Sequence, residues 1–334
     1  MRIIFFSALV ALFILVSIFI SGRVYEQLYS SSQKVEYGVT FSPRYAKYLN
    51  LDWQKVYTQI LDDLKVRNLR LTSYWDTIEF QKAQYDFSET DFLIKEAGKR
   101  EAKAVLVLGS RQPRWPECHI PTWAKDLTIT QRQQKVLEFI KAVVEKYKTS
   151  DVISAWQVEN EPFAYWFGEN CDTPDIKFLQ EEINLVKKLD SRPVVTTDSG
   201  EWSDWIDPMK LSDILGISLY RRSYSSLFNL YITYPLPVWM YPAKANLVKK
   251  LFAPNNQKIF ISELQAEPWT NIGVLDTSLD EQVRLFSAKD LQGNVLYAQK
   301  TGFDSIYLWG VEWWFYMAQN GYPEYLEYTK TLFR

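Results

Sequence analysis

The sequence predicts a (β/α)8 barrel (a TIM barrel), preceded by one N-terminal transmembrane or signal helix. Three observations lead to this fold class. Eight short apolar runs alternate with longer amphipathic stretches, a pattern typical of parallel sheets. The segment 35–334 has the length of one such barrel. A doubly wound open sheet would usually show a glycine-rich turn after its first strand, whereas Gly38 stands alone there.

The elements follow one another in a regular order after residue 34. The predicted strands are 35–41, 68–72, 104–109, 152–158, 193–197, 214–220, 258–262 and 305–309. The predicted helices are 53–65, 88–100, 131–147, 176–189, 281–298 and 323–333. Residues 203–212 form a poor helix pattern, and residues 221–241 form a long insert that is apolar for a loop.

The N-terminus carries an uncharged 18-residue run, IIFFSALVALFILVSIFI, at residues 3–20. A helix of this length just crosses a bilayer core of roughly 30 Å. We therefore expect residues 1–22 to be a signal anchor or a signal peptide, 23–34 a polar tether, and 35–334 the barrel. The barrel would be held at a membrane outside the cytoplasm, or secreted if the N-terminal segment is cleaved.

Composition excludes several classes of function. The formal net charge is −2 and no basic run is present, which argues against a nucleic-acid partner. The single histidine, His119, leaves too few ligands for a catalytic zinc or metal pair, and a Ser-His-Asp triad would depend on that one residue. Carboxylate chemistry remains, and it needs neither a metal nor a cofactor.

Two further residue types have open interpretations. The 13 tryptophans can serve as core packing or can line a sugar cleft, since flat aromatic rings stack on the apolar faces of sugars. Cys118 and Cys171 fall in segments predicted as loops. They are either unrelated thiols or a disulfide between two loops on one face of the barrel.

Two glutamates stand where the barrel strands end. Strand 152–158 runs into Glu159, Asn160 and Glu161, and strand 258–262 is followed by Glu263. The carboxyl ends of barrel strands carry active sites, so Glu161 and Glu263 are expected to face one cleft. Cleavage of a glycosidic bond needs one carboxylic acid to protonate the leaving oxygen and one carboxylate to attack. Carboxyl groups about 5–5.5 Å apart give retention, whereas wider pairs give inversion.

The segment Trp156–Pro162, read together with Ile261-Ser262-Glu263, resembles clan A of the glycoside hydrolases, the retaining (β/α)8 enzymes. The resemblance covers residues 35–334, and families 5, 39 and 42 of that clan share these features. It implies that Glu161 is the acid/base and Glu263 the nucleophile. It also implies that Asn160 binds the hydroxyl next to the anomeric carbon. A histidine that many family 5 members carry near the site is not evident here.

Three further strand ends match the clan pattern. Arg70, on the second strand, would support the nucleophile, and Tyr220, after the sixth, would contact it. Trp309, at the end of the eighth, would form the floor of the sugar site.

Several residues are weaker candidates. Glu159 shares parity with Glu161 if the strand continues, and Glu267 shares parity with Glu263 and is its nearest competitor as nucleophile. Trp75, Arg111 and Glu312 follow other strands and are candidate substrate ligands. The segment 111–119 is either a clamp for sugar hydroxyls or a rigid proline-rich loop. The insert 221–241 would cover the cleft or lie against the membrane.

The sequence thus predicts a retaining glycosidase or endo-glycanase that acts on a β-linked oligo- or polysaccharide. Two alternatives remain open at this point. One is a glycan-binding barrel that has lost turnover, which the presence of both carboxylates argues against. The other is an envelope-glycan transglycosylase that uses the same residues and differs only in its acceptor.

Overall fold

The computed structural model describes Gly22, Val24 and residues 34–225, 227–253 and 257–334. Its core is a closed parallel barrel, with strand order β1-β10-β9-β6-β5-β4-β3-β2. The barrel strands are β1 (Glu36–Phe41), β2 (Asn68–Leu71), β3 (Lys103–Leu108), β4 (Ile153–Val158), β5 (Val194–Asp198), β6 (Ile214–Leu219), β9 (Lys258–Gln265) and β10 (Ser305–Trp309). The predicted (β/α)8 barrel and its eight strands are therefore confirmed.

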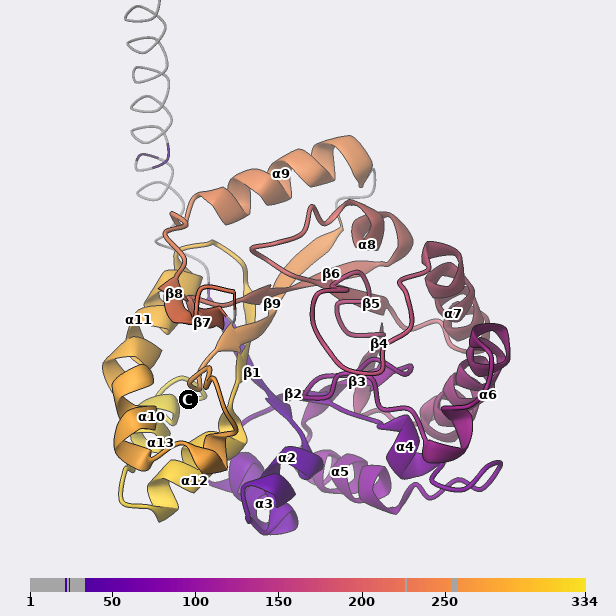
Figure 1. The fold of residues 1–334 in the computed structure, drawn as a ribbon, viewed down its shortest axis with the longest axis horizontal. Helices are drawn as coiled ribbons and strands as arrows, with labels where there is room; N and C mark the ends of the chain where they lie inside the picture. Colours follow the sequence, from indigo (N-terminus) through magenta and orange to yellow (C-terminus); the bar gives the residue numbers. More distant parts are fainter. Residues whose placement is uncertain (1–21, 23, 25–33, 226, 254–256) are drawn as a thin grey trace, which may run out of the picture.

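Helices surround the strands, as Figure 1 shows. They are α2 (Pro43–Tyr48), α3 (Trp53–Asp62), α4 (Trp75–Ile78), α5 (Ser88–Gly98), α6 (Ile129–Tyr147), α7 (Ile176–Leu189), α8 (Ile206–Leu211), α9 (Met240–Phe252), α10 (Leu279–Leu285), α11 (Ala288–Gln299), α12 (Val311–Gln319) and α13 (Glu324–Thr329). Capping sets several of their starts. In α6, for example, the Thr128 side chain accepts from the Gln131 backbone while the Gln131 side chain binds the Thr128 backbone.

Several parts of the chain differ from the prediction. The predicted helix 281–298 is two helices, α10 and α11, because Phe286 is extended and Ser287 caps α11 together with Asp290. The insert 221–241 contains an antiparallel hairpin, β7 (Arg222–Ser225) and β8 (Leu230–Thr233). Helix α9, which the sequence analysis did not predict, follows the insert and packs on α8.

One positively charged side chain, that of Arg70, lies in the central layer of the barrel interior. Arg70 on β2 is in register with Val105 on β3, and Val105 with Ala155 on β4. Val105, Ala155, Val195, Phe260 and Tyr307 form a separate apolar cluster inside the barrel. Because alternate residues of a strand share a face, Arg70 points into the barrel. The larger apolar cluster fills the space between the strands and the helices.

The predicted N-terminal segment falls, apart from Gly22, on residues 1–21, which lie outside the described part of the chain. Within the described residues, none of the helices combines the length and the apolar character that a bilayer crossing requires.

A disulfide joins Cys118 and Cys171, with an S–S distance of 2.02 Å. The two cysteines belong to the loops after β3 and β4, so the bond ties two neighbouring loops together at one end of the barrel. The disulfide alternative of the sequence analysis is thus confirmed.

Candidate active site

The backbone turns sharply after β4 and sends two neighbouring glutamates in different directions. Glu159 and Glu161 both have positive φ values, 56° and 44°, which L residues rarely adopt. The Glu159 carboxylate accepts hydrogen bonds from the backbone N–H groups of Ser110 (2.8 Å) and Arg111 (2.5 Å). Glu161 instead lines the cleft, and its backbone N–H donates to Thr197 Oγ1 on β5 (2.8 Å). Of the two, Glu161 is the one that can meet a substrate.

Glu263 lies within β9, opposite Glu161, and is held by two donors. Arg70 Nη1 donates to Glu263 Oε1 (2.6 Å), and the Tyr220 hydroxyl donates to Oε2 (3.1 Å). The Arg70 side chain is fully buried, so its charge is poorly screened by water. Burial and the Glu263 charge keep the Tyr220 pKa well above its usual range, which keeps the hydroxyl protonated as a donor. Both contacts stabilise a negative charge on Glu263.

Asn160 is fixed by the same guanidinium. Arg70 Nη2 donates to Asn160 Oδ1 (2.6 Å), and Thr197 Oγ1 is 3.2 Å from the same oxygen. Since the oxygen side of the amide is occupied, Nδ2 is turned away from Arg70 and donates to Glu117 Oε2 (3.1 Å). The strand ends of β2, β4, β5 and β9 are therefore tied into one network.

The electrostatics of the pair differ between its members. Burial raises the pKa of Glu161 well above its usual range, and the neighbouring Glu263 charge raises it further. Ser218 on β6 opposes this effect through a hydrogen bond. A carboxyl group whose pKa is raised, beside a carboxylate held by Arg70, is the arrangement that acid and nucleophile roles require.

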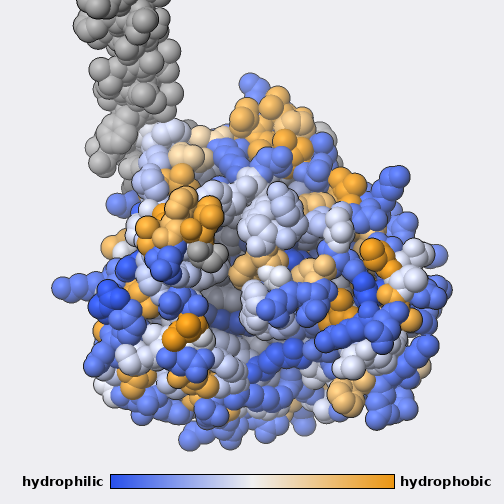
Figure 2. Space-filling view, in the orientation of Figure 1, coloured by the Kyte–Doolittle hydropathy of each residue, from blue (hydrophilic) through white to orange (hydrophobic). Residues whose placement is uncertain are grey.

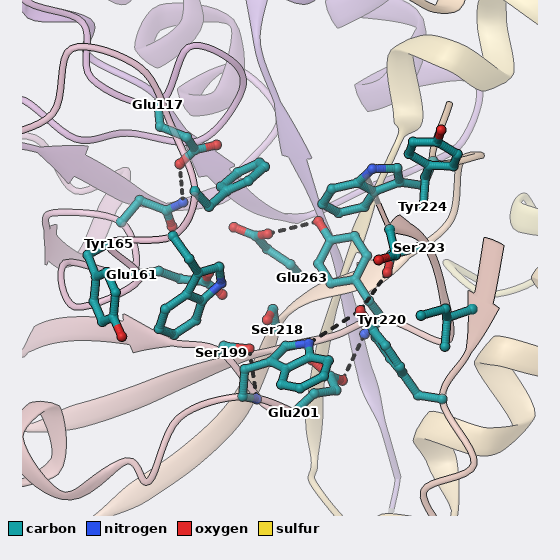
Figure 3. A pocket seen from close by; sticks show the side chains of 18 of the residues that line it. Glu117, Glu161, Tyr165, Ser199, Glu201, Ser218, Tyr220, Ser223, Tyr224 and Glu263 are labelled. Carbon is teal, nitrogen blue, oxygen red and sulfur yellow. Dashed lines mark hydrogen bonds between the residues drawn. The ribbon is translucent and has the colours of Figure 1, made fainter. Parts of the chain in front are cut away.

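A cavity of about 710 Å³ at the carboxyl ends of the strands is lined by Asn160, Glu161, Ser218, Tyr220 and Glu263, among others. The face shown in Figure 1 is hollowed near its middle in space-filling view (Figure 2). Figure 3 shows Glu117, Glu161 and Glu263 reaching the same space from different sides. Three tryptophans also line it, of which Trp166 and Trp202 are half-exposed or more and Trp269 packs edge-on against Tyr220.

The hairpin β7–β8 forms one wall of this cavity. Ser223 and Tyr224 of β7, Ile232 of β8 and the neighbouring Phe228 and Tyr234 are among its lining residues. The insert therefore lies at the cleft, as one of its two predicted placements required.

Two acidic residues of the cleft were not singled out from the sequence. Glu117 is almost fully buried, and burial raises its pKa to about 7. Burial likewise raises the pKa of Glu201 to about 7, although Glu201 accepts hydrogen bonds from the Tyr220 backbone (2.9 Å) and the Tyr241 hydroxyl (2.7 Å). Glu117 belongs to the segment 111–119, which the sequence analysis considered as a clamp for sugar hydroxyls or a rigid loop, but no pattern in the sequence connects Glu117 to strand β4.

Trp309 lies at the end of β10, as predicted, but it is covered. The guanidinium of Arg114 lies 4.1 Å from the centre of the Trp309 ring, and Tyr45 flanks the guanidinium at 3.7 Å. Arg114 also pairs with Glu267 and, at 2.7 Å, with Glu312. None of these residues lines the cavity, so the structure groups Trp309, Glu267 and Glu312 around Arg114 and apart from Glu161 and Glu263.

The two remaining candidate ligands, Trp75 and Arg111, also lie outside the cavity lining. Trp75 is fully buried, donates to Glu79 (2.7 Å) and packs against Phe139. Arg111 donates to the backbone carbonyls of Asn160, Ala164 and Phe167 and so shapes the loop after β4.

His119 is buried against Tyr74 and hydrogen-bonded to Arg44. Among the residues described, no cluster of three or more His, Cys, Asp or Glu is arranged to hold a metal ion.

Comparison with known proteins agrees with this architecture. The family model described as glycosyl hydrolase family 10 matches residues 44–169, a family that the sequence analysis did not name. The chain is 24% identical over 165 residues to the β-galactosidase LacZ of Lactobacillus acidophilus, which covers 43% of this chain and 24% of that protein. The chain thus spans about a quarter of the curated relatives that it matches.

Two solved structures share the fold at low sequence identity. Xylanase 10B from Thermotoga maritima superposes with a TM-score of 0.54 at 14% identity, covering 83% of each chain. A family 39 glycoside hydrolase from Bacteroides cellulosilyticus gives 0.52 at 15% identity, covering 83% of this chain and 56% of that one. The two solved structures show the shared fold, and the family-model match, together with the glutamates at the strand ends, supports assignment of the chain to clan A of the glycoside hydrolases, a group of O-glycosyl hydrolases.

Proposed function

We propose that the chain is a retaining glycoside hydrolase that cleaves β-linked glycosides by double displacement, with Glu161 as acid/base and Glu263 as nucleophile. One observation carries the proposal. Glu161, whose pKa burial raises well above its usual range, lines the same cavity as Glu263, whose charge Arg70 and Tyr220 stabilise. The two carboxyl groups therefore stand in different environments, as an acid and a nucleophile require.

The reaction then proceeds in two steps. Glu263 attacks the anomeric carbon while Glu161 donates its proton to the leaving oxygen, which forms a covalent glycosyl-enzyme. Water, deprotonated by Glu161, next attacks the anomeric carbon, releases Glu263 and restores the starting protonation states. Arg70 and Tyr220 hold the attacking carboxylate in place, and Asn160, whose Nδ2 donates one hydrogen to Glu117, has a second Nδ2 hydrogen for the sugar beside them.

The shape and lining of the cavity suit a sugar substrate. Aromatic rings provide flat apolar surfaces, and the serines and glutamates provide partners for hydroxyl groups. The named relatives favour a β-galactoside or a β-linked xylan among the substrates to test first.

We also propose that the chain acts at a membrane outside the cytoplasm. The uncharged run at residues 3–20 supports an anchor, and the disulfide between Cys118 and Cys171 suits an oxidising compartment. Membrane flotation of the expressed chain, with and without alkylation of free thiols, tests both points. Recovery of the uncleaved chain in the soluble fraction would contradict the anchor.

The catalytic proposal is tested with the full chain in detergent against aryl β-glycosides and β-linked polysaccharides. Glu161→Gln and Glu263→Gln should each abolish most of the turnover, whereas Glu145→Gln, an exposed change on α6, should not. The first product observed by NMR should have the β configuration. An α product would exclude retention.

The same experiment separates the two alternative functions. Binding of a glycan without turnover would favour a glycan-binding barrel. Transfer to an added sugar acceptor in preference to water would favour a transglycosylase.

A further inference from the structure

The cavity carries a charge pattern that goes beyond the catalytic pair. Four glutamates line it, namely Glu117, Glu161, Glu201 and Glu263. Its lining, taken over the described residues, contains neither lysine, arginine nor histidine. Arg70, which neutralises Glu263, lies behind the carboxylate and is fully buried. A sugar with a carboxylate or sulfate group would therefore meet acceptors and negative charge without a cationic partner.

Glu117 is the member of this set with an unused acceptor next to the reaction centre. Its Oε2 accepts from Asn160 Nδ2 (3.1 Å), whereas none of the described residues donates to Oε1. Oε1 is not one of the inaccessible polar atoms that lack a partner, so it is reachable by solvent. Because Glu117 lines the cavity, we take Oε1 to face it. Figure 3 shows the side chain directed toward the space beside Glu263.

The loop that carries Glu117 is firmly fixed. The next residue, Cys118, is bonded to Cys171, and the Glu117 backbone accepts from Gln112 N–H (2.8 Å) and pairs with Glu169. A side chain held in this way can discriminate between substrates, because little freedom remains to adapt to a poorly matched one.

The network defines which part of the sugar lies beside Glu117. Arg70 bonds both Glu263 and Asn160, so these two groups sit side by side, and Asn160 in turn touches Glu117. If Glu263 attacks the anomeric carbon, Asn160 and Glu117 lie beside one of the two ring neighbours of that carbon. The ring oxygen carries no proton and would repel a carboxylate. The neighbour facing Glu117 is therefore the carbon that bears a substituent, C2.

We propose that Glu117 determines substrate specificity by accepting a hydrogen bond from the C2 substituent, which selects sugars with a hydrogen-bond donor there and a free amine most strongly. The inference rests on the proposed glycosidase function. Both an ammonium and a hydroxyl make a charge-assisted hydrogen bond to the carboxylate, but the ammonium adds the attraction of a full positive charge. Since burial raises the Glu117 pKa to about 7, the carboxylate predominates about one pH unit above that value.

The test compares three aryl β-glycosides that differ only at C2, carrying an amine, a hydroxyl or hydrogen. They are assayed about one pH unit above neutrality with wild type, Glu117→Gln and the control Glu169→Gln, an exposed neighbour of Glu117. Wild type should show the order amine, hydroxyl, hydrogen in kcat/KM. Glu117→Gln should lower kcat/KM for the amine by about ten- to a hundredfold, for the hydroxyl less, and for the 2-deoxy sugar hardly at all.

A purely structural role would lower all three values by the same factor, and that result would overturn the proposal. The same holds if wild type does not prefer the amine to the 2-deoxy sugar. If no glycoside is turned over, the proposed hydrolase function fails instead. Calorimetric binding of the three methyl glycosides then still tests Glu117, because its amide variant should weaken only the sugars with a donor at C2.

Discussion

Removing the Tyr220 hydroxyl isolates one contact of the proposed nucleophile. Tyr220→Phe deletes the 3.1 Å hydrogen bond to Glu263 Oε2 and keeps the ring that packs against Trp269 at 5.5 Å. A hydrogen bond to a charged group contributes about 1.5–3 kcal/mol. At about 1.4 kcal/mol per tenfold change, this range corresponds to a loss of about 10- to 150-fold in kcat/KM.

The structure places the expected effect at the lower end of that range. The O–H···O separation of 3.1 Å exceeds the usual length of about 2.7–2.8 Å, and Arg70 still donates to the other carboxylate oxygen. We therefore expect a loss of about tenfold in kcat/KM.

The assay is initial-rate hydrolysis of the best aryl β-glycoside across a pH series. Tyr316→Phe on α12, outside the cavity lining, is the matched control. A loss of kcat/KM below twofold would refute the role of Tyr220 as a ligand of the nucleophile.

Three further predictions follow from the same geometry. Glu161→Gln should lower kcat by about 10²- to 10⁴-fold for poor leaving groups and much less for activated aryl leaving groups. Wild-type activity should fall as pH rises through the raised Glu161 pKa, because the leaving oxygen needs the protonated form. Equal losses for both kinds of leaving group would count against an acid role. Cys118→Ser together with Cys171→Ser releases a loop closed across 53 residues and should lower the free energy of unfolding by about 4 kcal/mol in denaturant titrations, whereas an unchanged midpoint would refute that estimate. Glu182→Gln should raise the melting temperature above neutral pH but hardly at a pH near 4. Burial and Glu159 raise the Glu182 pKa in the folded state, so ionisation of this residue stabilises the unfolded wild-type chain once the pH exceeds its pKa there. Equal shifts in melting temperature at both pH values would contradict this.

The sequence predicted the barrel because both faces of its parallel strands are buried, which leaves short apolar runs that are visible without tertiary information. Glu161 and Glu263 could be found for a related reason, since strand ends are sites that topology alone brings together. The choice between Glu159 and Glu161 needed the structure, because it depends on two positive φ values that no residue preference indicates.

The residues that escaped prediction depend on contacts between distant loops. Glu117 reaches the cleft because its loop is bonded to the one after β4, and sequence spacing does not contain that partner. Trp309 was placed correctly on its strand, but its ring is covered by Arg114, which comes from the loop after β3. Helix α9 has Pro242 in its first turn and comes directly after an irregular insert, so no clear signal in the sequence marks where the helix begins.

The loop after β3 has one consequence for how a substrate would bind. Arg114 ties this loop to Glu267 in the loop after β9 and to Glu312 in the first turn of α12, and the disulfide ties it to the loop after β4. The wall bearing Glu117 is therefore ordered before any ligand arrives. Association does not have to restrict this loop, so its cost in conformational entropy is small and binding should show little loss of loop motion. Substitutions that free the loop, such as Arg114→Ala, should weaken binding because the loop must then be ordered when the ligand binds. Calorimetry would register this as a more negative binding entropy.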